Sequence, residues 1–223
     1  MAPEKTYSVD DILAHVTPNP SLNGGVAQVL NRQQKIEKIA LKFREIMEVL
    51  ELDLAHDSLK ETPNRVARMY VDELFSGLWK ENFPKITVID NEMNYDQMVV
   101  AQRVEIKSTC EHHFQTIDGF ATIAYIPKDR VVGLSKLNRV AKYFSRRPQV
   151  QERLTKQIAD CLCYVLNTEN VAVHISAKHY CMAQRGIEDT TSTTVTCDLR
   201  GDFKRKGETR AEFLSHCDTN YFR

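Results

Sequence analysis

The sequence predicts an α+β protein in which an antiparallel sheet has helices packed on one face and is preceded by N-terminal helices. Three observations lead to this fold class. Apolar residues recur at helical spacing as far as Leu74, strand-like patterns follow between Ile86 and Ile126, and two further helical stripes precede a last pair of strands. Helices and antiparallel strands in separate runs, rather than in strict alternation, are typical of the α+β class.

Composition limits the classes of protein to which the chain can belong. Its 223 residues, 42% of them hydrophobic, suffice for one sizeable domain with an appendage. Lys+Arg and Asp+Glu both total 30, so no net charge draws the whole chain to nucleic acid or to an acidic membrane. Because it lacks both a membrane-spanning apolar run and a signal peptide, we expect a cytoplasmic protein whose six cysteines are reduced.

The first two regions are predicted to be helical. Residues 1–32 are expected to form an arm, in which a helical stripe after a Ser8 cap is followed by helix breakers: Val9, Ile12, Leu13 and Val16, then Pro18, Pro20, Asn23, Gly24 and Gly25. Residues 33–84 are expected to hold two helices. The first has apolar residues from Ile36 to Leu50, and the second opens at Thr62-Pro63 and continues to Leu74.

Residues 85–223 are predicted to contain the sheet. Strands are expected at 86–89, 98–106, 114–117 and 120–126, with Asp118-Gly119 as a hairpin turn between the last two. Helical stripes then run from Leu134 to Phe144 and, after the interruption at Pro148, from Val150 to Val165. The last strands are expected at 171–175 and 193–199.

Candidate metal ligands occur in two short segments, Cys110-Glu111-His112-His113 and His179-Tyr180-Cys181. A catalytic zinc takes three protein ligands, among which thiolate and imidazole are favoured, and leaves a fourth position open. Cys110 and His113 are spaced for one turn, and His179 and Cys181 would share a face of an extended segment. The alternative is that these side chains only pack or satisfy core hydrogen bonds. Their clustering favours metal, whereas no such clustering surrounds the remaining cysteines: Cys161, Cys163, Cys197 and Cys217.

A second constellation is basic. Residues 128–156 contain nine Lys or Arg and only two acids. Gly133-Leu134-Ser135-Lys136 stands where a helix is expected to begin, so that free backbone N–H groups, the Ser135 hydroxyl and the charges of Lys136 and Arg139 could converge on phosphate. A solvated helix face is an equally good interpretation of the charges alone. A Walker-type glycine loop is missing, so a P-loop enzyme has no support.

Several motifs together resemble GTP cyclohydrolase I, in order and at matching separations: Cys110-Glu-His-His, Gly133-Leu-Ser-Lys-Leu-Asn-Arg139, Arg147-Pro-Gln-Val-Gln-Glu-Arg-Leu154, His179-Tyr-Cys181 and Arg185-Gly-Ile. The resemblance extends from about Gln33 to the end of the chain and leaves the role of the arm open. It implies that GTP and water become 7,8-dihydroneopterin triphosphate and formate, the first step of pteridine and tetrahydrofolate biosynthesis. It also implies that residues 85–223 form a catalytic domain of the tunnelling fold, in a homodecamer with active sites between subunits.

The resemblance also implies a role for each matching residue. Zn²⁺ would be held by Cys110, His113 and Cys181, with His112 and His179 as acid/base groups that move protons while activated water attacks C8 of guanine. Triphosphate contacts would come from Ser135, Lys136, Arg139 and Arg185, and from Arg65 of an adjacent subunit. Glu152 would accept hydrogen bonds from guanine N1–H and the 2-amino group, and Gln151 would be a further substrate contact. Without the resemblance, an ion pair between Glu152 and Arg153 or Lys156 would be the preferred interpretation.

Two other functions remain open. A zinc nucleobase deaminase shares the metal chemistry, but its His-x-Glu and Pro-Cys-x-x-Cys signature is missing. A binding module with a structural zinc and a basic RNA-binding face is the other, although structural zinc sites usually have four protein ligands. Formate release from GTP distinguishes these hypotheses, because a deaminase would release ammonia and a binding module would release neither.

Overall fold

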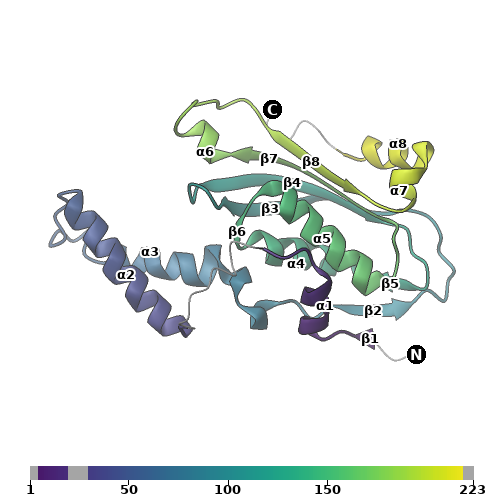
Figure 1. Ribbon diagram of the computed structural model, residues 1–223, viewed down its shortest axis with the longest axis horizontal. Helices are drawn as coiled ribbons and strands as arrows, with labels where there is room; N and C mark the ends of the chain where they lie inside the picture. The colour runs from purple at the N-terminus through teal and green to yellow at the C-terminus, as the bar shows by residue number, and fades with distance from the viewer. Residues whose placement is uncertain (1–4, 20–29, 218–223) are drawn as a thin grey trace.

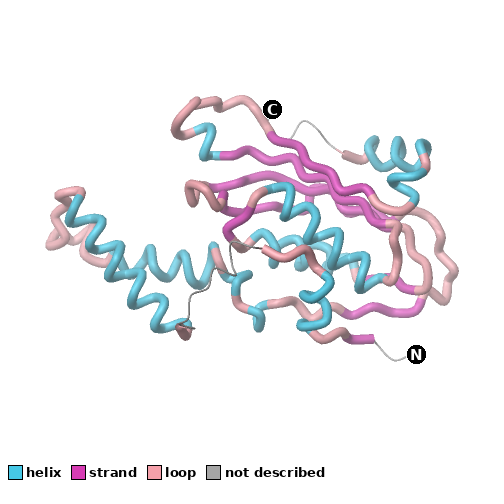
Figure 2. Tube along the Cα trace, in the orientation of Figure 1, coloured by secondary structure: helices cyan, strands magenta, loops and turns pink. Residues whose placement is uncertain are grey.

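The computed structural model describes residues 5–19 and 30–217 (Figure 1). Its α-helices are α1 (Val9–His15), α2 (Arg32–Val49), α3 (Thr62–Arg68), α4 (Leu134–Ser145), α5 (Gln151–Leu166), α6 (Tyr180–Ala183), α7 (Asp202–Arg205) and α8 (Gly207–Ser215). A π-helix, η2 (Met69–Leu74), continues α3, and two 3₁₀ helices follow, η3 (Ser76–Leu78) and η4 (Lys80–Asn82). Its strands are β1 (Lys5–Thr6), β2 (Thr87–Asp90), β3 (Val99–Cys110), β4 (Thr116–Tyr125), β5 (Arg130–Val132), β6 (Pro148–Gln149), β7 (Val171–His179) and β8 (Thr194–Leu199). The predicted α+β class is confirmed (Figure 2).

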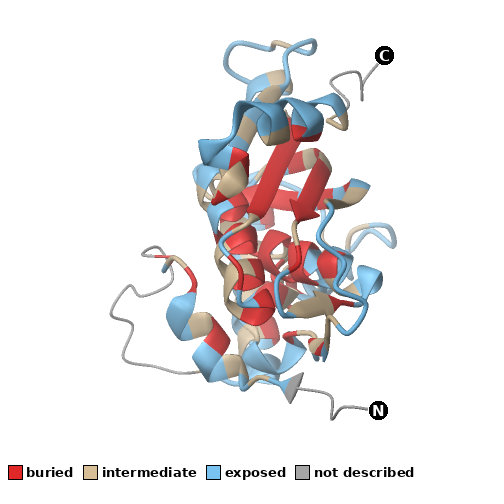
Figure 3. Cartoon of the chain, turned by 90° about the vertical axis from the view of Figure 1, so that its right-hand side faces the viewer, coloured by how far each residue is buried: buried red, intermediate tan, exposed pale blue. Residues whose placement is uncertain are grey.

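A five-stranded sheet forms the centre of the molecule, with the strand order β6-β3-β4-β7-β8. All neighbours are antiparallel except β6, which runs parallel to β3 beside Cys110. The apolar stripes of α4 and α5 pack on one face of this sheet, with Phe144 and Leu162 fully buried in the same core cluster as Ile123 and Val173. Buried residues are concentrated on these strands and helices (Figure 3). A smaller antiparallel sheet has the order β1-β2-β5.

Helices cover both faces of the large sheet, so the prediction of helices on one face only is wrong. The helices on the second face, α7 and α8, belong to the C-terminal part of the chain. Ala124 and Ala172 alternate with the residues that face α4 and α5, and they form a separate buried cluster with Phe203 of α7 and Phe213 of α8. These two helices span only four and nine residues, and each contributes one buried apolar side chain. Such short helices have no apolar stripe that the sequence could reveal.

The predicted turn at Asp118-Gly119 is also wrong, because both residues lie inside β4. Gly119 pairs with Ile106 on one side and with Ala177 on the other. A Cβ atom at Gly119 would come within 2.2 Å of the carbonyl oxygen of Ser176, so glycine here permits a close approach of two strands. The chain instead reverses between β3 and β4, in the segment that carries Glu111-His112-His113.

The predicted N-terminal helices are confirmed. Ser8 caps α1 by accepting a hydrogen bond from Asp11 N–H at 3.0 Å, and Ile12 of α1 is buried in the main core. Pro63 lies in the first turn of α3, and α2 and α3 pack on each other through a small cluster of their own that includes Ile36 and Ala67. The predicted breakers Pro20, Asn23, Gly24 and Gly25 lie outside the described residues.

The α2–α3 pair projects to one side of the sheet (Figure 1). The division into an arm (1–32), a helical region (33–84) and a catalytic domain (85–223) remains a prediction. In the described part of the chain, no helix combines the length and the apolar character needed to cross a membrane.

Candidate metal centre

The turn between β3 and β4 holds the first two candidate ligands. Cys110 is the last residue of β3; its backbone N–H donates to the carbonyl of Gln115 at 2.8 Å, and its own carbonyl accepts from Phe114 N–H at 2.9 Å. Glu111 N–H donates to a carbonyl oxygen of β6 at 3.0 Å, which ties the turn to the neighbouring strand. These backbone bonds define the turn that separates Cys110 from His113, as their spacing predicts.

The third candidate ligand, Cys181, lies just beyond the end of β7. The pairing of His179 with Ile117 brings this end beside the start of β4, next to the hairpin turn. The chain then forms one helical turn, α6, so the expectation that His179 and Cys181 share an extended segment is wrong. Helical backbone from Tyr180 onward rotates Cys181 away from the strand alternation and towards the hairpin.

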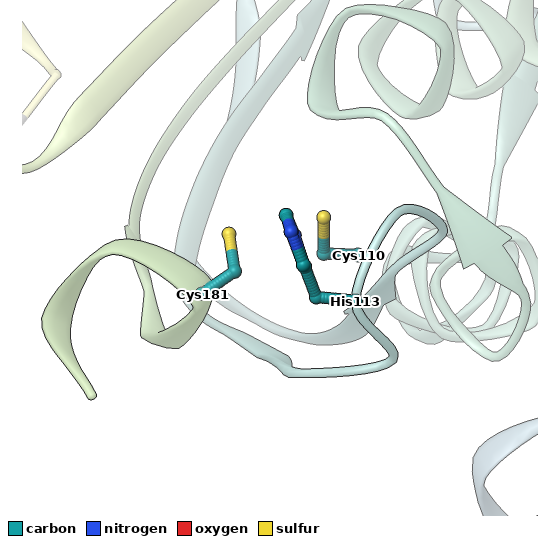
Figure 4. Close-up of side chains that lie close together, drawn as sticks. All are labelled: Cys110, His113 and Cys181. Atoms are coloured by element: carbon teal, nitrogen blue, oxygen red, sulfur yellow. The ribbon is translucent and has the colours of Figure 1, made fainter. Parts of the chain in front are cut away.

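The three side chains form a Cys–His–Cys cluster, in which the ligand atoms of Cys110, His113 and Cys181 all lie within 4.8 Å of one another (Figure 4). It is the only such group of three or more potential ligands among the described residues. With Zn–S near 2.3 Å and Zn–N near 2.0 Å, the edges of a zinc tetrahedron are about 3.5–3.8 Å long, so side-chain movements of about 1 Å would close the site. Two thiols and one imidazole therefore fit a zinc ion, and the exposed His113 leaves one side open.

Burial, a neighbouring thiol and one arginine influence the protonation of the cluster. Burial and the neighbouring Cys110 thiol raise the pKa of Cys181, while the charge of Arg185 acts in the opposite direction. Arg185 Nη1 lies 2.7 Å from His113 Nε2. Because a guanidinium can only donate, His113 accepts this bond through Nε2. Metal binding must displace the thiol protons and is therefore expected to release protons.

Both predicted acid/base histidines flank the cluster. His112 is exposed, and its Nδ1 lies 3.8 Å from Cys110 Sγ. His179 is half-buried, and its Nε2 lies 2.7 Å from Gln151 Oε1. Burial lowers the pKa of His179 below its usual value, against the opposing effect of the Glu152 carboxylate. A largely neutral imidazole at pH 7 is one that can still take up a proton.

An ion pair fastens the hairpin to α5. Arg153 donates to both carboxylate oxygens of Glu111, at 2.7 and 3.2 Å, and the two side chains are only 14% and 17% exposed. Arg153 therefore pairs with Glu111, not with the neighbouring Glu152. Sequence reasoning missed this pair because its members are 42 residues apart, although the position of Glu111 between two candidate ligands was a usable signal.

Comparison of the sequence with known proteins identifies the family of this chain. Residues 39–218 match the model of the GTP cyclohydrolase I family. The chain belongs to the GTP cyclohydrolase I family. It is 58% identical over 187 residues to GTP cyclohydrolase 1 of Serratia proteamaculans, which is 84% of this chain and 85% of that relative. It is 59% identical over 186 residues to GTP cyclohydrolase 1 of Pectobacterium carotovorum, covering 83% and 84% of the two chains.

A third relative, GTP cyclohydrolase 1 of Shewanella sp. (strain ANA-3), is 54% identical over 187 residues, covering 84% of this chain and 87% of its own. The resemblance inferred from the motifs is thereby confirmed, and the chain is a hydrolase of the GTP cyclohydrolase I family.

Four residues matched to the family's substrate contacts lie on helices that carry none of the three cluster residues. Ser135, Lys136 and Arg139 lie in the first turns of α4, which begins after β5 and ends before β6, the strand beside Cys110. At about 1.5 Å per residue this helix is about 18 Å long, so its start lies about that far from the end that leads to β6. Arg65 lies on α3, in the projecting helical pair (Figure 1).

The other cysteines behave as the sequence predicts. All six are free thiols. Cys161 is fully buried in the main core, and burial raises its pKa far above the usual value, which makes it unreactive. Cys197 is exposed on β8.

Proposed function

We propose that this chain is a zinc-dependent GTP cyclohydrolase that opens the imidazole ring of guanine in GTP and yields formate and 7,8-dihydroneopterin triphosphate, the first step of pteridine and tetrahydrofolate biosynthesis. The observation that carries the proposal is the convergence of Cys110, His113 and Cys181 within 4.8 Å in a member of this family. A site with three protein ligands and an open side is of the catalytic type, whereas structural zinc sites are closed by four ligands.

The residues around the cluster fit the chemistry of ring opening. Zinc, when bound there, supplies Lewis acidity that lowers the pKa of water towards neutrality. Hydrolysis requires proton transfers to the ring nitrogen whose bond to C8 breaks, and His112 and His179 are the groups placed beside the cluster to make them. The exposed Glu152 carboxylate is close enough to His179 to act on its charge, and we assign it to guanine N1–H and the 2-amino group.

The triphosphate is assigned to cations that come from more than one subunit. Arg185 contacts His113 in its own chain, whereas Ser135 and Lys136 lie near the start of α4, and Arg139 lies at its middle. We therefore assign the α4 start, and Arg65, to neighbouring copies. We propose a homodecamer of the tunnelling fold with sites between subunits, as in the family.

Exposed apolar residues on the projecting helices support such an assembly. Leu41, Ile46, Val49 and Leu50 are 51–82% exposed along one helix and the residue that follows it. Exposed apolar patches of this kind mark interaction surfaces. A neighbouring subunit that covered them would bury apolar surface that a monomer leaves in water.

Formate release tests the proposed function. Purified protein with added zinc should release formate from GTP and form a fluorescent pterin, and removal of zinc by a chelator should abolish both. Ammonia release without formate would indicate a deaminase. Tight RNA binding with neither product would indicate a binding module.

A further inference from the structure

Both polar atoms of the Gln151 side chain have hydrogen-bond partners, and one of these partners is His179. It is the first residue of α5 and is 1% exposed. Its Nε2, which has two N–H groups, donates to three acceptors, so that one N–H is shared: the carbonyl oxygens of Ile175 at 3.2 Å and Thr194 at 3.0 Å, and the hydroxyl of Thr196 at 3.1 Å. Its Oε1 lies 2.7 Å from His179 Nε2. The amide thus joins two adjacent strands to a histidine at the edge of the metal centre.

These partners determine which way the amide faces. Backbone carbonyl oxygens can only accept hydrogen bonds, so the atom of Gln151 that faces Ile175 and Thr194 must be the NH₂ group. A flipped amide would place its oxygen against two other oxygens and lose these bonds. The amide oxygen must therefore face His179, where it can only accept.

A neighbouring threonine pair agrees with this direction. Thr155 Oγ1 donates its proton to the carbonyl of Gln151 at 2.8 Å, so in its 2.6 Å contact with Thr196 it accepts. The Thr196 hydroxyl therefore donates its proton to Thr155, and its oxygen accepts from Gln151 Nε2. Each hydroxyl proton in the network has one partner, and all partners require the same orientation of Gln151.

We propose that Gln151 is a positioning residue that holds His179 in the tautomer with the proton on Nε2, so that Nδ1 presents the lone pair used for proton transfer. This inference rests on the proposed function. It replaces the direct substrate contact expected of Gln151 with an indirect role, because a side chain with this burial and these four partners has its amide engaged within the protein. A neutral imidazole carries one N–H, so fixing Nε2 as the donor also fixes Nδ1 as the acceptor.

A direct measurement of the tautomer tests the proposal without reference to catalysis. Zinc-loaded protein labelled with ¹³C and ¹⁵N in histidine is suited to solid-state NMR, which does not depend on the size of the assembly. Comparison with His179→Asn identifies the signal of His179. The Nε2–H tautomer is expected in the parent protein, and an Nδ1–H tautomer would overturn the proposal.

The variant Gln151→Met tests the functional consequence, because methionine has a similar length and its thioether sulfur is only a weak acceptor for His179. We expect pterin formation to lose about 10²-fold or more in kcat, the scale of a general acid/base group, with zinc content and the KM for GTP near those of the parent. The His179 signal should become a mixture of tautomers. The control is Gln157→Met, the same substitution at an equally buried residue of α5 whose side chain bonds to Thr17 and Gln149 and not to His179, and it should retain kcat and the Nε2–H signal.

The outcomes separate this inference from the proposed function. A large rise in KM with an unchanged kcat in Gln151→Met would show that Gln151 contacts GTP, and would overturn the positioning role. If Gln151→Met fails to fold or to bind zinc, the tautomer in the parent protein still decides. A parent protein that releases no formate would refute the proposed function, whereas the tautomer of His179 would remain measurable and would test the assignment of the nitrogens by itself.

Discussion

The ion pair between Arg153 and Glu111 should control zinc affinity, because it fastens the hairpin that carries two of the three ligands. Replacing Arg153 with Met removes both hydrogen bonds to a carboxylate whose side chain is 17% exposed. Loss of one partner destabilises a fully buried pair by about 3–5 kcal/mol, whereas exposed pairs contribute about 0.2–1 kcal/mol. For this mostly buried, bidentate pair we expect about 2 kcal/mol.

This energy converts into a measurable change in affinity. Zinc binds only the ordered hairpin, so disorder of the hairpin competes with binding. At about 1.4 kcal/mol for each factor of ten, 2 kcal/mol predicts that the Kd for zinc rises up to about thirtyfold. The assay is competition against a chromophoric zinc chelator, with pterin formation measured at saturating zinc to show that the site can still be assembled.

Two further variants make the test specific. Lys156→Met alters an exposed residue on the same helix and should leave zinc affinity unchanged. The double variant Glu111→Gln/Arg153→Met should bind zinc better than Arg153→Met alone, because no mostly buried carboxylate is left without its arginine. A folded Arg153→Met protein with the zinc affinity of the parent would refute the role of the pair.

Four other predictions follow from the site and the sheet. Cys181→Ser should lose zinc and formate release together, measured by metal analysis and formate assay, whereas Cys197→Ser should keep both. His179→Ala should retain zinc and GTP binding while pterin formation falls by about 10²–10⁴-fold, and a rise in a ring-opened, formylated intermediate should be visible in nucleotide absorbance. If Glu152 accepts from the 2-amino group, ITP should have a lower kcat/KM than GTP and ATP should be excluded. Gly119→Ala should strongly destabilise the protein, with a lower Tm or a loss of soluble expression, because the new Cβ would lie 2.2 Å from a carbonyl oxygen of β7.

Each of these has an outcome that would contradict it. Stoichiometric zinc in an inactive Cys181→Ser protein would remove Cys181 from the ligand set. Pterin formation at the parent rate by His179→Ala would show that this histidine is only a neighbour of the site, and equal kcat/KM values for GTP and ITP would do the same for Glu152. A Gly119→Ala protein as stable as the parent would mean that β4 and β7 can separate without loss.

Local features of the sequence predicted most of the helices. Apolar stripes predicted α2, α4 and α5 because each of these helices buries one face, and a helix of 12 residues or more repeats its pattern several times. Capping residues such as Ser8 and the Thr62-Pro63 pair marked helix starts through interactions within one turn. A short motif likewise suggested two ligands of the candidate metal centre, because Cys110 and His113 lie within four residues of each other.

The role of Gly119 and the presence of the short helices α7 and α8 could not be predicted, because the contacts that explain them are made with residues distant in the sequence. Asp118-Gly119 has the composition of a hairpin turn, but Gly119 is needed where β4 approaches the backbone of β7, almost sixty residues later. The helices α7 and α8 exist because Phe203 and Phe213 fill a cluster over Ala124 and Ala172. Nothing within those helices alone indicates that contact.

From the sequence alone, the element types of the longer segments and the family could be predicted, because they depend on neighbouring residues or on motifs in order. The resemblance to the family then implied the proposed donor set of Cys110, His113 and Cys181. How these parts meet became visible in the folded chain: α6 turns Cys181 towards the hairpin, and α5 brings Arg153 to Glu111 and Gln151 to His179. Strand pairing and helix packing set these contacts over tens of residues. A pattern read along the chain contains the side chains that take part but not the distances between them.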